Sequence, residues 1–334
     1  MLNVCVLPVS GGTFPVQLAI LRVLIEIDLS CEIYLAASGG NVATYLAHAG
    51  HWKTSSIQQV IGQLHNNMFV SKWSSFLPIN FFSVYLQGSL YKNGSGCYKL
   101  LSTFLNSTLM ASKEIWSGTY NLSKQSAQLF CNRVEKDTIL KYTNNEVYQM
   151  SPPIYCDNDL EKISKVILAS ASIPGVIPAQ LIDDTYYADG GVGAASPLFL
   201  LQNELYNISN DGLHIYYLSG CNLNDNNIDE KEKNLITNME TSASNLIHTM
   251  MINDRVTGIE LIKRLLQRDV QFREFLVDSQ TMYTWMREQH NYKYTFTEIH
   301  PLTYQTLDIT TFKDSDIQRL YEDSYSNLSC RVYY

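Results

Sequence analysis

Hydrophobic and polar positions alternate with two different periods in the first fifty residues of the chain. Residues 3–8 are mostly apolar, which predicts a buried strand, and the apolar positions from Pro15 to Ile27 recur at helical spacing. Residues 31–37 repeat the strand pattern. Residues 41–49 repeat the helical one, with Gly50 as the expected C-cap. Strand, helix, strand and helix in this order predict a parallel sheet that is covered on both faces.

The pattern beyond residue 50 is less regular. Residues 56–150 are expected to be mostly helical, with an aromatic-rich segment at 68–91 that predicts either core packing or an acyl-binding wall. The charged, Asn-rich stretch at 222–234 predicts a surface loop. The other expected elements are a helix over 160–169, a hairpin of strands 180–182 and 186–188 around Asp183-Asp184, strands within 213–220 and 292–302, and a closing helix over 314–326.

No internal repeat or linker divides the chain. We therefore predict one α/β domain over residues 1–334, with three α/β/α layers around a mostly parallel central sheet. A hydrophobic content of 46% and a charged content of 17% over 334 residues are sufficient for a large core.

Composition also narrows the class of partner and the compartment. The net charge of -8 argues against a nucleic-acid partner, because phosphate binding needs clustered Lys and Arg. No secretory signal pattern is present, and polar residues and a proline interrupt the longest uncharged run, between Lys72 and Lys92. The seven cysteines lack metal-site spacing, so we expect them to be buried and unpaired. These features predict a cytoplasmic protein, with peripheral contact to a membrane surface left open.

Ser38 is placed between a predicted strand and a predicted helix, with Ala36 two positions before it and Gly39 and Gly40 directly after it. A serine on such a sharp turn projects its hydroxyl above the end of the sheet, and the crowded turn needs small neighbours. The amide of Gly39 then faces an oxyanion at a helix N-terminus. Two interpretations follow: Ser38 is a nucleophile, or it only caps the helix.

Two glycine-containing turns offer the rest of an acyl-transfer site. Ser10-Gly11-Gly12 follows the first strand, and its bare backbone is suited to directing N–H groups at an anion. Asp189-Gly190-Gly191 follows the hairpin and supplies a carboxylate that backbone can approach closely. Each sequence is also compatible with an ordinary turn. Among the seven histidines, only His214 and His300 border strands downstream of Asp189, and neither has a local signature of a catalytic base.

The glycine turn, the serine turn and the Asp-Gly-Gly turn, in this order, resemble the patatin-like phospholipases. The similarity is strongest in "ASASIPGVIPAQLIDDTYYADGGVGAASPL" and extends over about residues 3–200, with 201–334 as the C-terminal part of the same domain. The resemblance implies a lipid acyl hydrolase with a Ser38–Asp189 dyad and no histidine, metal or cofactor. Its oxyanion hole would comprise Gly11, Gly12, Thr13 and Gly39, supported by Ala36, Gly40, Gly190 and Gly191, and its substrate would be a glycerolipid or lysolipid.

The sequence departs from that family at two positions. The family loop G-G-G-x-R-G is S-G-G-T-F-P here, so Phe14 replaces the arginine, and Ala36 replaces the first glycine of G-x-S-x-G. These departures leave two alternatives to a hydrolase: a weakly active or inactive lipid-binding protein, and an acyltransferase that uses the same residues.

Overall fold

The structure of the chain is a computed structural model that describes residues 1–51, 55–56, 59, 97–105, 110–142, 151–174, 177–192, 197–208, 211–220, 235–277, 279–289, 291–302 and 314–334. The aromatic-rich segment at 68–91 and the predicted surface loop at 222–234 lie outside the described residues.

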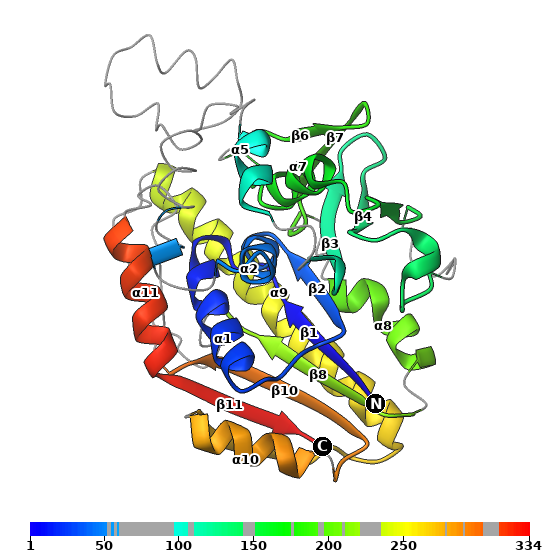
Figure 1. Cartoon of the computed structure of the whole chain (residues 1–334), viewed down its shortest axis with the longest axis vertical. Helices are drawn as coiled ribbons and strands as arrows, with labels where there is room; N and C mark the ends of the chain where they lie inside the picture. The colour runs from blue at the N-terminus through cyan, green and yellow to red at the C-terminus, as the bar shows by residue number, and fades with distance from the viewer. Residues whose placement is uncertain are drawn as a thin grey trace.

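The described strands form one eleven-stranded sheet (Figure 1). Its main path runs in the order β5-β4-β3-β2-β1-β8-β10-β11-β9, and β7 pairs with β3 and with β6 beside this path. The central strands β3, β2, β1, β8 and β10 are parallel. β4 and β7 pair antiparallel with β3, β11 pairs antiparallel with β10 and β9, and β5 pairs parallel with β4. The strands are β1 (Leu2–Leu7), β2 (Ile33–Ala37), β3 (Glu114–Asn121), β4 (Ser126–Cys131), β5 (Ile154–Tyr155), β6 (Gln180–Ile182), β7 (Thr185–Asp189), β8 (Leu213–Leu218), β9 (Phe272–Val277), β10 (Tyr294–Pro301) and β11 (Leu328–Tyr333).

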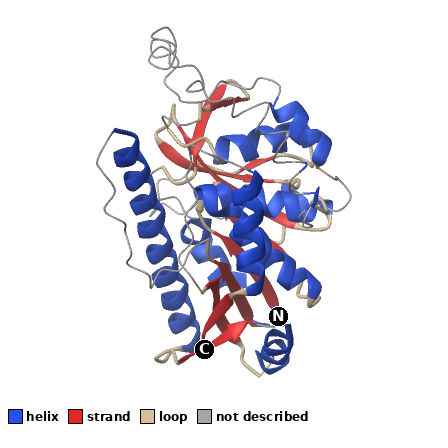
Figure 2. Ribbon diagram, turned by 90° about the vertical axis from the view of Figure 1, so that its left-hand side faces the viewer, coloured by secondary structure: helices blue, strands red, loops and turns tan. Residues whose placement is uncertain are grey.

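Helices cover both faces of this sheet, which confirms the predicted three-layer α/β/α fold. Figure 2 shows one long helix on one face and several shorter helices on the other. The long helix is α9, and it packs with α8 on the same face. The helices are α1 (Phe14–Glu26), α2 (Gly39–His48), α5 (Cys97–Phe104), α7 (Leu160–Ser170), α8 (Pro197–Ile208), α9 (Leu235–Leu266), α10 (Ser279–Gln289) and α11 (Asp314–Ser326).

The alternation of side chains along β1 explains why its sequence is apolar throughout. Cys5 and Leu7 face the core beneath α1, α2 and α11, whereas Val4 and Val6 face the core beneath α8 and α9. A strand that is buried on both faces has no solvent-facing positions, so it appears as a continuous apolar run rather than an alternating one.

Two expectations from the sequence were wrong. Residues 56–150 are not mostly helical where they are described, because β3 and β4 lie within them. Their local pattern is mixed, and they are strands because β3 pairs with β2 on one side and with β4 on the other. The cysteines are buried as predicted where they are described, but Cys5 and Cys31 form a disulfide. Cys5 lies in β1 and Cys31 just before β2. Because these strands pair in parallel, the Cα atoms of the two cysteines are 5.9 Å apart, within the usual range for a disulfide bridge.

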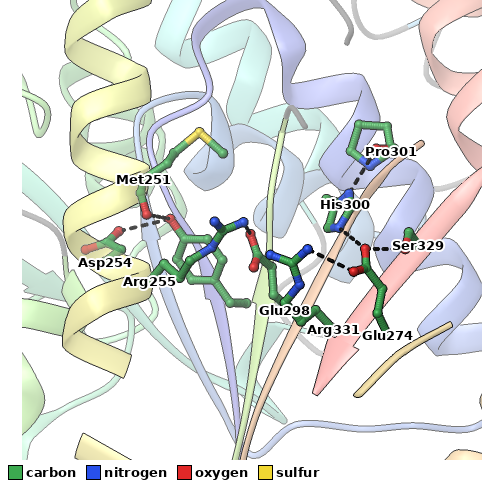
Figure 3. Close-up of polar contacts among 10 residues, drawn as sticks. Met251, Asp254, Arg255, Glu274, Glu298, His300, Pro301, Ser329 and Arg331 are labelled. Atoms are coloured by element: carbon green, nitrogen blue, oxygen red, sulfur yellow. Dashed lines mark hydrogen bonds and ion pairs between the residues drawn. The ribbon is translucent and has the colours of Figure 1, made fainter. Parts of the chain in front are cut away.

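Ion pairs link α9 with β10 and β11 with β9 (Figure 3). Arg255 of α9 donates to Glu298 of β10 at 2.6 Å, and Arg331 of β11 donates to Glu274 of β9 at 2.9 Å. The Glu298 side chain is fully buried, so removing Arg255 would leave a buried carboxylate without its ion pair. None of the helices in the described ranges is long and apolar enough to cross a bilayer.

Candidate active site

The predicted site residues gather where several strands end at the same edge of the sheet. The glycine turn, η1 (Gly11–Thr13), follows β1, Ser38 directly follows β2, and Asp189 is the last residue of β7. Carboxyl ends of parallel strands in α/β sheets commonly form ligand-binding crevices. The fold therefore brings together three segments that are far apart in the sequence.

Ser38 has a backbone conformation that most residues avoid, with φ 54° and ψ −130°. The conformation turns the chain sharply from β2 into α2 and costs about 1–3 kcal/mol. Although Ser38 is the N-cap residue of α2, its side chain makes no capping hydrogen bond. Its Oγ instead donates to Asp189 Oδ2 at 2.7 Å. The simple capping interpretation of Ser38 is thus wrong.

Asp189 accepts two hydrogen bonds, and no cation among the described residues pairs with it. Its Oδ2 accepts from Ser38 Oγ, and its Oδ1 accepts from the Gly191 amide at 2.7 Å. Only 3% of the residue is exposed. Burial outweighs the two hydrogen bonds and raises the pKa of the Asp189 carboxyl from 3.8 to about 7. A carboxyl with such a pKa accepts and returns a proton near neutral pH.

An apolar cluster of Val9, Ala37 and Met250 lies beside this carboxyl. A Cβ atom added at Gly191 would lie 3.0 Å from Asp189 Oδ1, 3.4 Å from Met250 Sδ and 3.4 Å from Val9 Cγ1, so the thioether and the carboxylate border the same small space beside Gly191. Met250 belongs to α9, whose sequence has no signal that connects it with the site. Burial of the carboxyl among neighbours of this kind is the physical cause of the raised pKa of Asp189.

The glycine turn lies directly against the start of α2. A Cβ atom at Gly39 would lie 2.5 Å from Gly11 O and 3.1 Å from Gly11 N. The Thr13 amide donates to Ser10 O at 3.0 Å within the turn. Thr13 is the first residue of the turn whose amide bonds back within it, so the amides of Gly11 and Gly12 come before the first internal hydrogen bond of η1. The Gly39 amide likewise lies in the first turn of α2. Amides at these positions have no acceptor within their own helix. Of the four predicted oxyanion donors, Thr13 is therefore already committed, whereas the three glycine amides have no hydrogen-bond acceptor within the described parts of the chain.

Gln17 holds the glycine turn in place, and the sequence analysis missed it. This residue of α1 is fully buried, and its Nε2 donates to Pro8 O and Leu218 O, each at 3.0 Å. Its Oε1 accepts from Ser10 Oγ at 2.7 Å. A polar residue among the apolar residues of α1 was the one available signal. Phe14, in the position of the family arginine, is buried in the core instead.

Comparison with known proteins identifies the family. The patatin-like phospholipase family model matches residues 10–201, which is more than half of the chain. The chain belongs to the patatin-like phospholipase family. The family is one of lipid acyl hydrolases.

Among solved structures, the crystal structure of VipD from Legionella pneumophila is similar, at 12% sequence identity and with a TM-score of 0.33. The match covers 97% of this chain and 65% of VipD, so this chain spans less than two thirds of the length of VipD. No curated protein matches the chain.

Small residues allow the close approaches that this patatin-like site requires. A Cβ atom at Gly40 would lie 2.3 Å from Leu7 O, and one at Gly190 would lie 2.4 Å from Gly118 O. Both contacts are with backbone atoms, which have little freedom to move aside. Ala36, by contrast, is accommodated with its methyl group in the core.

The two histidines that were weighed as bases lie away from the dyad. His214 pairs in register with Asn3, at the opposite end of β1 from the glycine turn, and its Nδ1 is 2.7 Å from Thr295 Oγ1. His300 lies on β10, which is separated from β2 by β1 and β8. Within the described ranges, no group of three or more His, Cys, Asp or Glu residues is arranged to hold a metal ion.

Proposed function

We propose that the protein is a serine ester hydrolase that removes acyl chains from glycerolipids or lysolipids through an acyl-enzyme intermediate. Ser38 is the nucleophile and Asp189 its general base. The observation that carries the proposal is the 2.7 Å hydrogen bond from Ser38 Oγ to Asp189 Oδ2, between a strained serine and a buried carboxyl of raised pKa.

The dyad supports a complete proton cycle without a histidine. Asp189 accepts the Ser38 proton as Oγ attacks the ester carbonyl, and a tetrahedral oxyanion forms. Collapse of that intermediate breaks the bond to the alcohol, which takes the proton from Asp189 as it leaves. In the second half, Asp189 accepts a proton from water, the resulting hydroxide attacks the acyl group, and Ser38 Oγ leaves and takes the proton back.

The oxyanion requires donors that are fixed before the reaction. The amides of Gly11, Gly12 and Gly39 are the available groups, because the Thr13 amide is bound to Ser10. Gln17 keeps the loop before α1 rigid through its three hydrogen bonds. Each such donor contributes about 10²–10³ in rate in hydrolases of this type.

Labelling with a fluorophosphonate probe, combined with assays on phospholipids, lysophospholipids and triglycerides, tests the proposal. Wild type is expected to be labelled at Ser38 and to release fatty acid. Ser38→Ala and Asp189→Asn are expected to lose turnover while staying folded. Asp184→Asn, a change of the same kind in the exposed hairpin turn, serves as the control and is expected to retain it.

Three results would contradict the proposal. Full activity in either dyad variant would exclude the dyad. An unlabelled wild-type protein that still binds vesicles would favour the lipid-binding alternative. Acyl transfer to added alcohols in preference to water would favour an acyltransferase on the same residues.

A further inference from the structure

Ser170, the last residue of α7, directs its side chain out of its own helix. Ser164 and Ser172, in and just beyond the same helix, each donate to the carbonyl four residues before them, Leu160 O at 2.6 Å and Leu168 O at 2.7 Å. That is the usual arrangement for a serine in a helix. Ser170 Oγ donates instead to Gly118 O of β3 at 2.7 Å.

The same hydroxyl accepts a hydrogen bond from the backbone of the nucleophile. Ser38 N donates to Ser170 Oγ at 2.9 Å, and both residues are at most 1% exposed. The Ser170 hydroxyl thus donates its proton to the Gly118 carbonyl of β3 and accepts a hydrogen bond from the Ser38 amide. A hydroxyl engaged in this way connects two backbone groups and has no free proton for chemistry.

The end of α7 also holds the base. The Asp189 amide donates to Ser172 O at 3.0 Å, and the Gly190 amide donates to Ser170 O at 3.4 Å. One short segment, 170–172, therefore contacts the backbone of the nucleophile through a side chain and the backbone of the base through carbonyls.

The sheet shows why such a connection is needed. β2 and β7 pair with the same edge of β3, whose other edge pairs with β4: Gly118 lies opposite Ala37 of β2, and Thr119 lies opposite Asp189 of β7. Because β2 runs parallel and β7 antiparallel to β3, these two strands run toward each other along this edge, and Ser38 and Asp189 lie where their ends meet. They meet beside Gly118, which lies within β3 and not at its end, and the Gly118 carbonyl is the group that Ser170 binds.

We propose that Ser170 is a positioning residue that fixes the strained backbone of Ser38 relative to Asp189, so that Oγ and Oδ2 stay in contact. This inference rests on the proposed hydrolase function. In Ser170→Ala, the buried Ser38 N–H and Gly118 C=O both lose their partner. The turn at Ser38, whose φ is positive, then relaxes and moves Oγ away from the carboxyl.

Steady-state ester hydrolysis and the rate of fluorophosphonate labelling test this role. Ser170→Ala is expected to lower kcat and the labelling rate about 100-fold, the order of loss for a reacting group displaced by about 1 Å. The KM is expected to stay within about twofold, since Ser170 does not touch substrate. Ser170→Thr keeps the hydroxyl and is expected to restore most of the rate. Ser164→Ala, which removes an equally buried hydroxyl from the same helix, is the control and is expected to match wild type.

The outcomes separate this inference from the proposed function. A wild-type protein that neither labels nor hydrolyses esters contradicts the hydrolase itself. A wild-type protein that does both, with Ser170→Ala as fast as Ser164→Ala, contradicts only the role of Ser170. Equal losses in folded Ser170→Ala and Ser170→Thr would mean that side-chain volume matters rather than the hydroxyl, which also contradicts it. If Ser170→Ala does not fold, Ser170→Cys replaces it, and a wild-type rate in that variant overturns the proposal.

Discussion

Replacing Asp189 by Asn should abolish activity and, at neutral and alkaline pH, stabilise the fold. The substitution keeps the shape of the side chain. The Asn carbonyl oxygen accepts from the Gly191 amide as Oδ1 does, and the Asn amide group donates to Ser38 Oγ in place of the bond that Oδ2 accepts. Only the buried negative charge is removed.

The size of the effect follows from the pKa of the carboxyl. Burial raises that pKa from 3.8 to about 7, and each pKa unit corresponds to about 1.4 kcal/mol. Ionised Asp189 therefore costs the native state about 4 kcal/mol, as an upper bound, above pH 7.

The sign of the pH dependence is set by which state binds the proton. Between about pH 4 and pH 7 the native state keeps the Asp189 proton while the unfolded state has lost it, so rising pH removes stability from the wild type. Asp189→Asn has no such proton. The gain in free energy of unfolding from the substitution should thus be smallest near pH 4, grow up to about pH 7 and stay constant above.

Urea denaturation of both proteins at several pH values between 5 and 8 measures this gain. Asp184→Asn, in the exposed hairpin turn, is the matched control for loss of a carboxylate. A gain that does not change between pH 5 and pH 8, or that shrinks, would refute the conclusion that burial of Asp189 governs its pKa.

Three further predictions test the surroundings of the site and the fold. The kcat/KM of ester hydrolysis should rise with pH, with an inflection at about pH 7, as Asp189 ionises. Met250→Gln should move that inflection to lower pH by solvating the carboxyl, whereas Met250→Leu should leave it in place. Gly40→Ala should destabilise the protein by about 1–3 kcal/mol in urea denaturation, because the added methyl meets main-chain oxygens at the end of β1. Arg255→Met should cost about 3–5 kcal/mol by leaving its glutamate partner buried and unpaired. Arg319→Met, which breaks an exposed pair, should cost less than about 1 kcal/mol, and equal losses in these two arginine variants would contradict the importance of burial.

Local patterns in the sequence were sufficient to predict the helices and strands whose burial follows a regular pattern. β1, α1, β2 and α2 were predicted to within about two residues at each end, and the hairpin around Asp183-Asp184 and the helix α11 were also predicted. In these segments apolar periodicity and turn residues agree with the tertiary environment. β3 and β4 were not predicted, because long-range pairing in the sheet, rather than a local pattern, makes them strands.

By itself, the sequence determined the layer architecture, the family, and three turns that each place a particular residue type at the end of a strand. Only the tertiary structure decided which groups touch. The contact between Ser38 and Asp189, the commitment of the Thr13 amide, and the roles of Gln17, Ser170 and Met250 all depend on contacts between segments that are distant in the chain. The raised pKa of Asp189 has the same origin, because an aspartate has an ordinary pKa until the fold removes water from around it.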